Sequence, residues 1–179
     1  MTCSKLMKMT MAAVIAAPLT FAATTEANRE ATELAKKVRH ELVMLPFYGV
    51  FDNMTFRIED GVVTLSGQVT RPTLKSSAGN VVRKIEGVRA VRNEMEVLPL
   101  SPFDNGIRLR ALRAIYRQPA LQRYGWGVIP GIHIIVKNGE LTLEGVVANQ
   151  TDSNIANIVA NGVFGAFKVV NNLKVEKKS

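Results

Sequence analysis

The sequence predicts an α+β protein of two tandem αββαβ units, each a three-stranded mixed sheet packed on two helices, behind an N-terminal signal peptide. The first observation is a repeat. The segment DGVVTLSGQV at 60–69 recurs as NGELTLEGVV at 138–147, so that Gly139 lies 78 residues after Gly61. The same displacement relates Ala78 to Ala156 and Val91 to Val169 without an insertion. The repeating piece is therefore a whole folding unit.

The second observation is the order of the hydrophobic periodicities. Each unit has a helix-like stretch, two strand-like stretches, another helix-like stretch and a last strand. A hairpin followed by a helical crossover gives a mixed sheet, and two helices on one face of it complete a two-layer sandwich.

The first unit, residues 28–98, begins with a helix. Apolar residues at helical spacing predict it from about Glu30 to Leu45, ended by Pro46. Alternating apolar and polar residues then predict a half-buried strand over 54–59. Asp60-Gly61 is a strong hairpin signal because glycine accepts positive φ.

The returning strand of the first unit runs to Val69, with Gly67 on its inner face. Pro72 suits the first turn of a second helix. Gly87 is expected to end that helix in a left-handed conformation, and a last strand is predicted over 88–98.

The second unit, residues 103–176, repeats this order. Its predicted elements are helix 107–118, strand 132–136, turn Asn138-Gly139, strand 141–147, helix 152–164 and strand 167–175. Gly145 and Gly165 take the places of Gly67 and Gly87. A linker, residues 99–102, joins the units, and its two prolines are expected to restrict their relative motion.

Residues 1–23 have the features of a secretory signal. Lys5 and Lys8 precede an apolar run, and small residues up to Ala22 suit a signal peptidase. The run of about 11 apolar residues is short for a span of about 20, so a retained anchor is the weaker alternative. Cys3 would leave with the signal, and the mature protein would lack cysteine. A periplasmic or secreted protein cleaved near Ala22 is expected.

The charge of the chain is basic. Its 23 basic and 15 acidic residues give +8, and loss of Lys5 and Lys8 would leave 21 against 15, or +6. This balance favours anionic partners. Export and the lack of basic runs with interleaved aromatics argue against nucleic acid.

The residues around the two turns and the two later glycines resemble the BON domain of exported bacterial proteins. They are DGVVTLSGQV followed by GVRAVRN at 87–93, and NGELTLEG followed by 165–175. The second copy departs at Gly165-Ala166-Phe167, where the family usually has a β-branched residue after the glycine. The resemblance implies a non-enzymatic periplasmic protein of the osmotically inducible type, with a role in phospholipid or envelope association and in some members in chaperoning.

Two surfaces are candidates for contact with a lipid or protein partner. One is the second helix of the first unit, with Lys75, Arg83 and Lys84, where the other unit has Asn154, Asn157 and Asn161. The alternative is a solvated helix face. The other surface is a pair of glycine-flanked aromatic loops, containing Tyr48 in one unit and Arg123, Tyr124 and Trp126 in the other. The alternative is that these rings close a core or pack one unit on the other.

No residue pattern indicates an enzyme, a metal or a cofactor. His40 and His133 fall in different units without other ligands nearby. His133 and Ile135 share the strand face opposite Ile134, which the other unit or another chain is expected to cover. Asn93 and Asn171 face inward and are expected to form structural hydrogen bonds to a neighbouring loop. The sequence thus favours a binding protein for anionic phospholipid or envelope surface, with a periplasmic chaperone or protein-interaction module of the envelope stress response as the alternative.

Overall fold

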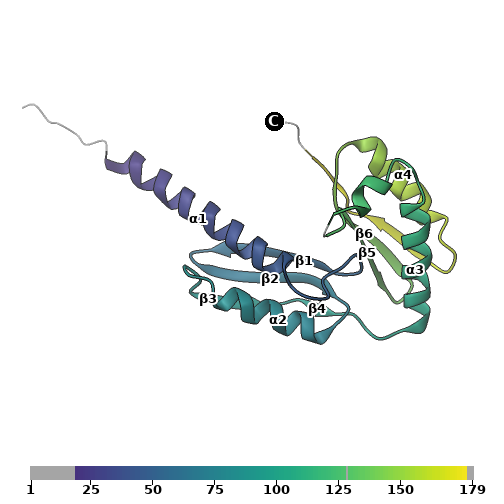
Figure 1. Ribbon diagram of the computed structural model, residues 1–179, viewed down its shortest axis with the longest axis horizontal. Coiled ribbons are helices and arrows are strands. Elements are labelled where there is room, and N and C mark those ends of the chain that lie inside the picture. The colour runs from purple at the N-terminus through teal and green to yellow at the C-terminus, as the bar shows by residue number, and fades with distance from the viewer. Residues whose placement is uncertain (1–18, 128, 177–179) are drawn as a thin grey trace, which may run out of the picture.

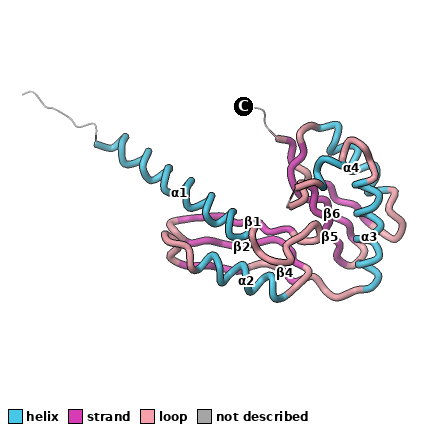
Figure 2. The backbone as a smooth tube through the Cα atoms, in the orientation of Figure 1, coloured by secondary structure: helices cyan, strands magenta, loops and turns pink. Residues whose placement is uncertain are grey.

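A computed structural model describes residues 19–127 and 129–176 of the protein, and the side chains from Arg29 onward. Most of the expected signal peptide, residues 1–18, lies outside the described residues, as does Val128. The described part forms two similar α+β units, each with a mixed sheet and two helices (Figures 1 and 2). The predicted fold class is confirmed.

The first unit has the predicted order of elements. They are α1 (Leu19–Val43), β1 (Asn53–Glu59), β2 (Val62–Val69), α2 (Pro72–Arg83), β3 (Ala90–Asn93) and β4 (Glu96–Val97). Strand β2 is central: it pairs antiparallel with β1 and parallel with both β3 and β4. The alternation of Met54, Phe56 and Ile58 in β1 places all three against the core, as its period predicts.

The second unit repeats this topology. Its elements are α3 (Pro102–Tyr116), η1 (Gln122–Gly125), β5 (Ile132–Lys137), β6 (Glu140–Val147), α4 (Gln150–Asn161), β7 (Lys168–Asn171) and β8 (Lys174–Val175). Strand β6 is central, antiparallel to β5 and parallel to β7 and β8. The short helix η1 was not predicted from the sequence.

The last strand of each unit is interrupted, which corrects the single strands predicted over 88–98 and 167–175. The side chain of Asn93 is the local cause: its Oδ1 accepts a hydrogen bond from Met95 N at 3.3 Å, and Asn171 repeats this with Leu173 N at 3.1 Å. The chain steps out of the ladder for two residues and rejoins it as β4 or β8.

The helix boundaries also differ from those predicted. Helix α1 begins at Leu19, well before Glu30, and projects beyond the sheet (Figure 1). Helix α2 ends at Arg83, so Gly87, with φ 91°, closes a following turn rather than the helix itself. Helix α3 starts at Pro102, because the Ser101 side chain accepts from Asp104 N at 3.1 Å and caps it.

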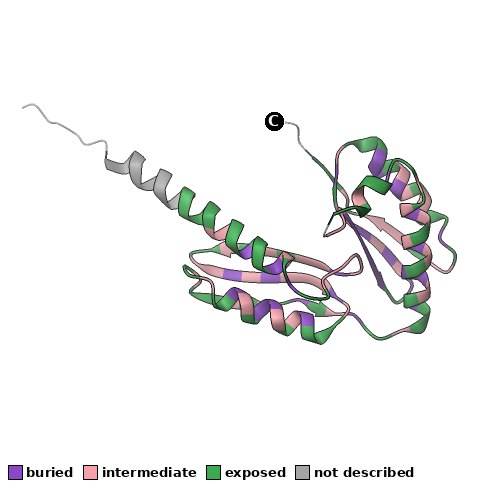
Figure 3. Cartoon of the chain, in the orientation of Figure 1, coloured by how far each residue is buried: buried purple, intermediate pink, exposed green. Residues whose placement is uncertain are grey.

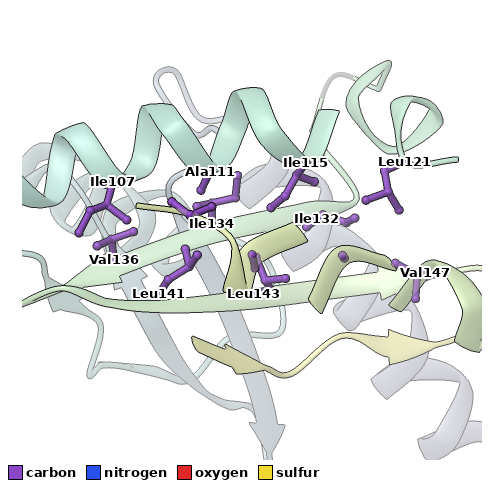
Figure 4. Close-up of a cluster of buried hydrophobic side chains, with 13 residues drawn as sticks. Ile107, Ala111, Ile115, Leu121, Ile132, Ile134, Val136, Leu141, Leu143 and Val147 are labelled. Atoms are coloured by element: carbon purple, nitrogen blue, oxygen red, sulfur yellow. The ribbon is translucent and has the colours of Figure 1, made fainter. Parts of the chain in front are cut away.

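Each unit has its own hydrophobic core between sheet and helices (Figure 3). Figure 4 shows the core of the second unit, where α3 contributes Ile107, Ala111 and Ile115 above the inner faces of β5 and β6. Val50 and Phe51 of the first unit also pack against this core. The two units are therefore docked, and do not merely follow one another on a linker.

Candidate functional site

The basic residues predicted on α2 do not form one cluster. Arg83 and Lys84 are exposed at its C-terminal end, where Arg83 Nη1 donates to Asn80 Oδ1 at 3.1 Å. Lys75 is half-buried near the other end, about 12 Å away along the helix axis at the usual helical rise. Lys84 instead borders a groove that is lined by Lys37 of α1 and also by Glu41 and Glu86. The structure thus brings together Arg83 and Lys84 and leaves Lys75 apart.

Tyr48 lies where the two units meet. Its ring stacks on the His133 ring with centroids 5.7 Å apart and planes 15° apart. Two residues further on, Val50 O accepts a hydrogen bond from Ile134 N at 2.7 Å, at the edge of β5. Burial raises the pKa of Tyr48. For Tyr48 the geometry matches the alternative in which the ring packs one unit on the other.

His133 is buried by this docking, with 7% of its surface exposed, and Ile135 beside it is 5% exposed. Its Nδ1 is buried without a hydrogen-bond partner. Burial lowers the pKa of His133, against the opposing effect of the Gly49 and Asp52 backbone and the Asp52 carboxylate. Lys137 and Glu96 add an ion pair between the units at 2.6 Å. The first unit covers the face that carries His133.

Arg123 and Tyr124 belong to a polar network at the start of α4. The Tyr124 hydroxyl donates to Asp152 Oδ2 and accepts from Ala148 N at 2.8 Å, and Arg123 forms an ion pair with Asp152. Burial alone would raise the pKa of Asp152, but hydrogen bonds from Tyr124 and Arg123 lower it on balance. Both residues therefore have structural partners, and a role in binding stays a prediction for them.

Trp126 is the exposed aromatic residue among the predicted contacts, with 81% of its surface accessible. It borders a hollow of about 360 Å³ whose other walls include Val50, Leu112 and Tyr116. The Tyr116 hydroxyl donates to Ile132 O at 2.7 Å, and burial raises its pKa to about 12. An indole ring next to an apolar hollow is free to contact a partner.

The predicted aromatic loop of the first unit contains a second ring, Phe47, next to Tyr48. Phe47 is 68% exposed, and the Arg71 guanidinium lies 4.6 Å from its ring centroid. This is the geometry of a cation–π contact. The sequence did not indicate this contact, because 24 positions separate Phe47 from Arg71.

A third aromatic surface lies on the second unit and was not predicted from the sequence. Phe103, Phe164 and Phe167 are 49%, 85% and 81% exposed, and the rings of Phe103 and Phe167 stack at 5.8 Å. The Arg110 guanidinium lies 5.9 Å from the Phe164 ring. The repeat contained a signal for this surface. At the positions equivalent to Phe164 and Phe167, the first unit has the charged residues Glu86 and Arg89, so the phenylalanines are not required by the shared fold.

The six predicted structural glycines all have positive φ, between 75° and 126°. They are Gly61, Gly67, Gly87, Gly139, Gly145 and Gly165. Within residues 19–127 and 129–176, no helix is long and apolar enough to cross a bilayer. The same residues contain no group of three histidine, cysteine or acidic side chains placed to hold a metal ion.

Comparison with protein families matches residues 30–99 and 118–177 to the BON domain. The second match starts after α3, the first helix of that unit. A search of curated proteins finds no match.

Two solved structures of CdsD, a structural protein of the type III secretion system of Chlamydia trachomatis, resemble the chain weakly. One has 14% identity and a TM-score of 0.30, and the alignment covers 82% of this chain and 94% of that one. The other, the C-terminal domain, has 15% identity and a TM-score of 0.29 over 81% and 98%. Similarity at this level carries no argument about function.

Proposed function

The chain belongs to the BON domain family, and from its two copies in tandem we propose that it is a non-enzymatic, exported protein that binds anionic phospholipid or envelope surface. Membrane and phospholipid association is a general property of BON domains. The basic balance of the chain, +8 in all and +6 without the expected signal, supports an anionic partner. A periplasmic or secreted location is part of the proposal.

The observation that carries the proposal is the exposure of Trp126. Trp126 is 81% exposed, and exposing so much apolar surface to water is unfavourable. A tryptophan ring is suited to the boundary between lipid headgroups and acyl chains. Phe47 under Arg71 gives the first unit an exposed aromatic residue with a cation beside it. Arg83 and Lys84 supply exposed charge for the headgroups.

Trp126 fluorescence tests the proposal directly, because it is the one tryptophan of the chain. With phosphatidylglycerol vesicles we expect a blue shift that phosphatidylcholine vesicles do not produce. Binding should weaken steeply as salt rises, since screening shortens the range of the attraction. An unchanged emission spectrum with anionic vesicles would contradict the proposed insertion.

The double variant Arg83→Gln/Lys84→Gln tests the contribution of the basic end of α2. Each cation near an anionic surface is worth about 1 kcal/mol, so vesicle affinity should fall about thirtyfold. The control, Arg92→Gln/Arg113→Gln, removes the same charge from exposed positions on β3 and α3. Equal losses in both variants would mean that net charge alone acts, without a defined basic surface.

A second candidate function, a chaperone or protein-interaction module, is favoured by the surface of Phe103, Phe164 and Phe167. Three exposed phenylalanines on one unit suit an apolar client. Client binding of this kind should persist at high salt, where headgroup binding is lost. Salt-resistant suppression of the aggregation of an unfolded test protein, lost in Phe164→Ser/Phe167→Ser, would support this function.

A further inference from the structure

A groove of about 550 Å³ runs along the linker between the two units. The first unit contributes Phe51, Thr70 and Arg71 to it, and α3 of the second contributes Asn105 and Arg108. The remaining wall consists of Leu98 and the linker, residues 99–102. Its volume falls in the range of pockets that hold small ligands.

The wall of the groove is apolar along one part and cationic along another. Phe51, Leu98 and Leu100 with the two linker prolines form the apolar part, and Leu100 is 97% exposed. Arg71 and Arg108 are its charged residues, and none of its lining residues is acidic. This composition suits a ligand with an anionic group on an apolar chain.

Arg108 has a buried donor that the described part of the protein does not satisfy. Its residue surface is 6% exposed, and Nη2 donates to Val136 O at 2.7 Å. Its Nε is buried with no hydrogen-bond partner. A buried guanidinium normally pairs with an acceptor, because an unsatisfied charged donor is costly. The corresponding position of the first unit is Glu30, which is exposed, so Arg108 is not required by the shared fold.

The two nearest buried carboxylates are already engaged. Asp104 accepts from Asn138 N at 2.9 Å and Gly139 N at 2.8 Å, while Asp52 accepts from Gly49 N and Thr70 N. Among the described residues, neither forms a salt bridge with Arg108. Burial lowers the pKa of Arg108, and the charges of Asp104 and Asp52 oppose this shift. Neither carboxylate accepts a hydrogen bond from the free Nε donor of Arg108.

Arg71 adds a second cation at the start of a helix. It occupies the N-cap position of α2, where no side chain caps the helix, whereas Ser101 caps α3 and Asn149 caps α4. Pro72 has no N–H and Leu74 N donates to Arg71 O at 3.1 Å, so it is the helix dipole that favours an anion at this end. The positive end of α2 thus reinforces the charge of Arg71 at the groove.

We propose that this groove binds a small anionic amphiphile, with a carboxylate or phosphate on Arg108 and Arg71 and a short apolar chain along Phe51, Leu98 and Leu100. The chemistry is that of fatty acids and of single-chain phosphate lipids. This site shares Arg71 with the contact to Phe47, but it is separate from Trp126 and from Arg83 and Lys84. Binding of a soluble amphiphile here can therefore be measured without membranes and is unaffected by a failure of Trp126 to insert.

The test titrates the full chain with octanoate and octyl phosphate below their micelle concentrations, using calorimetry. Octanol and inorganic phosphate are the comparison ligands. We expect saturable binding of one or both amphiphiles and much weaker binding of octanol and phosphate. The tighter amphiphile identifies the source, a fatty acid or a phosphate lipid. Octanol binding equal to that of octanoate, or phosphate binding equal to that of octyl phosphate, would overturn the proposal.

Variants then locate the site. Arg71→Gln removes an exposed cation and should weaken binding about tenfold, which is the value of one charge-assisted hydrogen bond. The control is Arg113→Gln, which removes an exposed cation elsewhere on the second unit and should leave binding unchanged. Leu100→Ser should weaken binding of the eight-carbon ligands by a similar factor, with Leu109→Ser as its control. Arg108→Gln should weaken it further if its fold, checked by circular dichroism, is intact. Equal effects of Arg71→Gln and Arg113→Gln would overturn the site.

Discussion

Gly67 and Gly145 occupy equivalent places on the central strands and share a constraint that is local to the residue. Gly67 has φ 108°, and a Cβ built there would lie 2.1 Å from Asn53 O. Gly145 has φ 126°, and its Cβ would lie 2.1 Å from Gly131 O. The obstacle in each case is backbone of the neighbouring edge segment, which a rotamer change cannot relieve.

Gly67→Ala should therefore destabilise the protein by about 2–4 kcal/mol, from the strained φ together with the contact. Equilibrium denaturation in urea measures this. Gly49→Ala is the matched control, because Gly49 has no atom within 4 Å of the added Cβ and should change stability by about 0.5 kcal/mol or less. A loss below about 1 kcal/mol in Gly67→Ala would show that the edge of the sheet relaxes easily.

Asn93 and Asn171 fix the last strand of each unit to the second helix of that unit. Asn93 Nδ2 donates to Lys75 O at 2.7 Å, and Asn171 Nδ2 donates to Ser153 O at 3.2 Å. Lys75 and Ser153 are themselves equivalent in the repeat. The predicted structural hydrogen bonds to a neighbouring loop are present, because Met95 N and Leu173 N lie in the short breaks of the last strands. The bonds to the helix were not predicted. One amide therefore both interrupts the strand and holds it to the helix above.

Asn93→Ala should cost about 1–3 kcal/mol, because Lys75 O and Met95 N lose their side-chain partner in a half-buried place. Asn171→Ala should have a similar effect on the second unit. The control is Asn80→Ala, on the exposed side of α2, which should stay within about 0.5 kcal/mol. Thermal unfolding of the three variants gives the comparison. A neutral Asn93→Ala would mean that the backbone ladder alone holds the last strand.

The docking of the two units depends on the segment between α1 and β1. Tyr48 stacks on His133, Val50 accepts from Ile134 N, and Phe51 packs on the core of the second unit. In the corresponding segment of the second unit, Trp126 remains exposed instead. Each unit is small, so apolar area buried between them adds to stability that a core of this size supplies only marginally.

Docking should depend on pH through His133. Burial lowers the pKa of His133 below its ordinary value of 6.5, so the unfolded chain takes up a proton at higher pH than the folded protein does. The stability that the neutral, buried His133 contributes is therefore complete above pH 6.5 and is lost as the pH falls from 6.5 through the lowered pKa. The groups that face it are Tyr48, Asp52 and Glu144. Denaturation between pH 7.5 and 5 should show this loss in the wild type.

His133→Phe keeps an aromatic ring for Tyr48 but cannot titrate, so the loss between pH 7.5 and 5 should disappear. His40→Gln replaces the other histidine of the chain, which is exposed on α1, and should retain the loss. A pH dependence that survives in His133→Phe and vanishes in His40→Gln would place its origin on α1 instead.

The sequence alone determined the repeat, the types of the elements, the two glycine turns and the inward-facing residues of the strands. These depend on the period of hydrophobicity and on which residues accept positive φ, which are properties of a few neighbouring residues. The start of α3 was misplaced because Ser101 acts as a cap inside a stretch that was taken for linker.

The use of the two aromatic loops was decided by contacts between residues far apart in the chain. Tyr48 and Trp126 have similar neighbours in the sequence. However, the Tyr48 ring stacks on His133, whereas Trp126 is exposed to solvent. Likewise, Arg108 reads in the sequence as one more basic residue of a helix, and only the meeting of α3, β5 and the linker leaves it buried with a free donor. Burial depends on which surface lies opposite, and a local pattern contains no information about that.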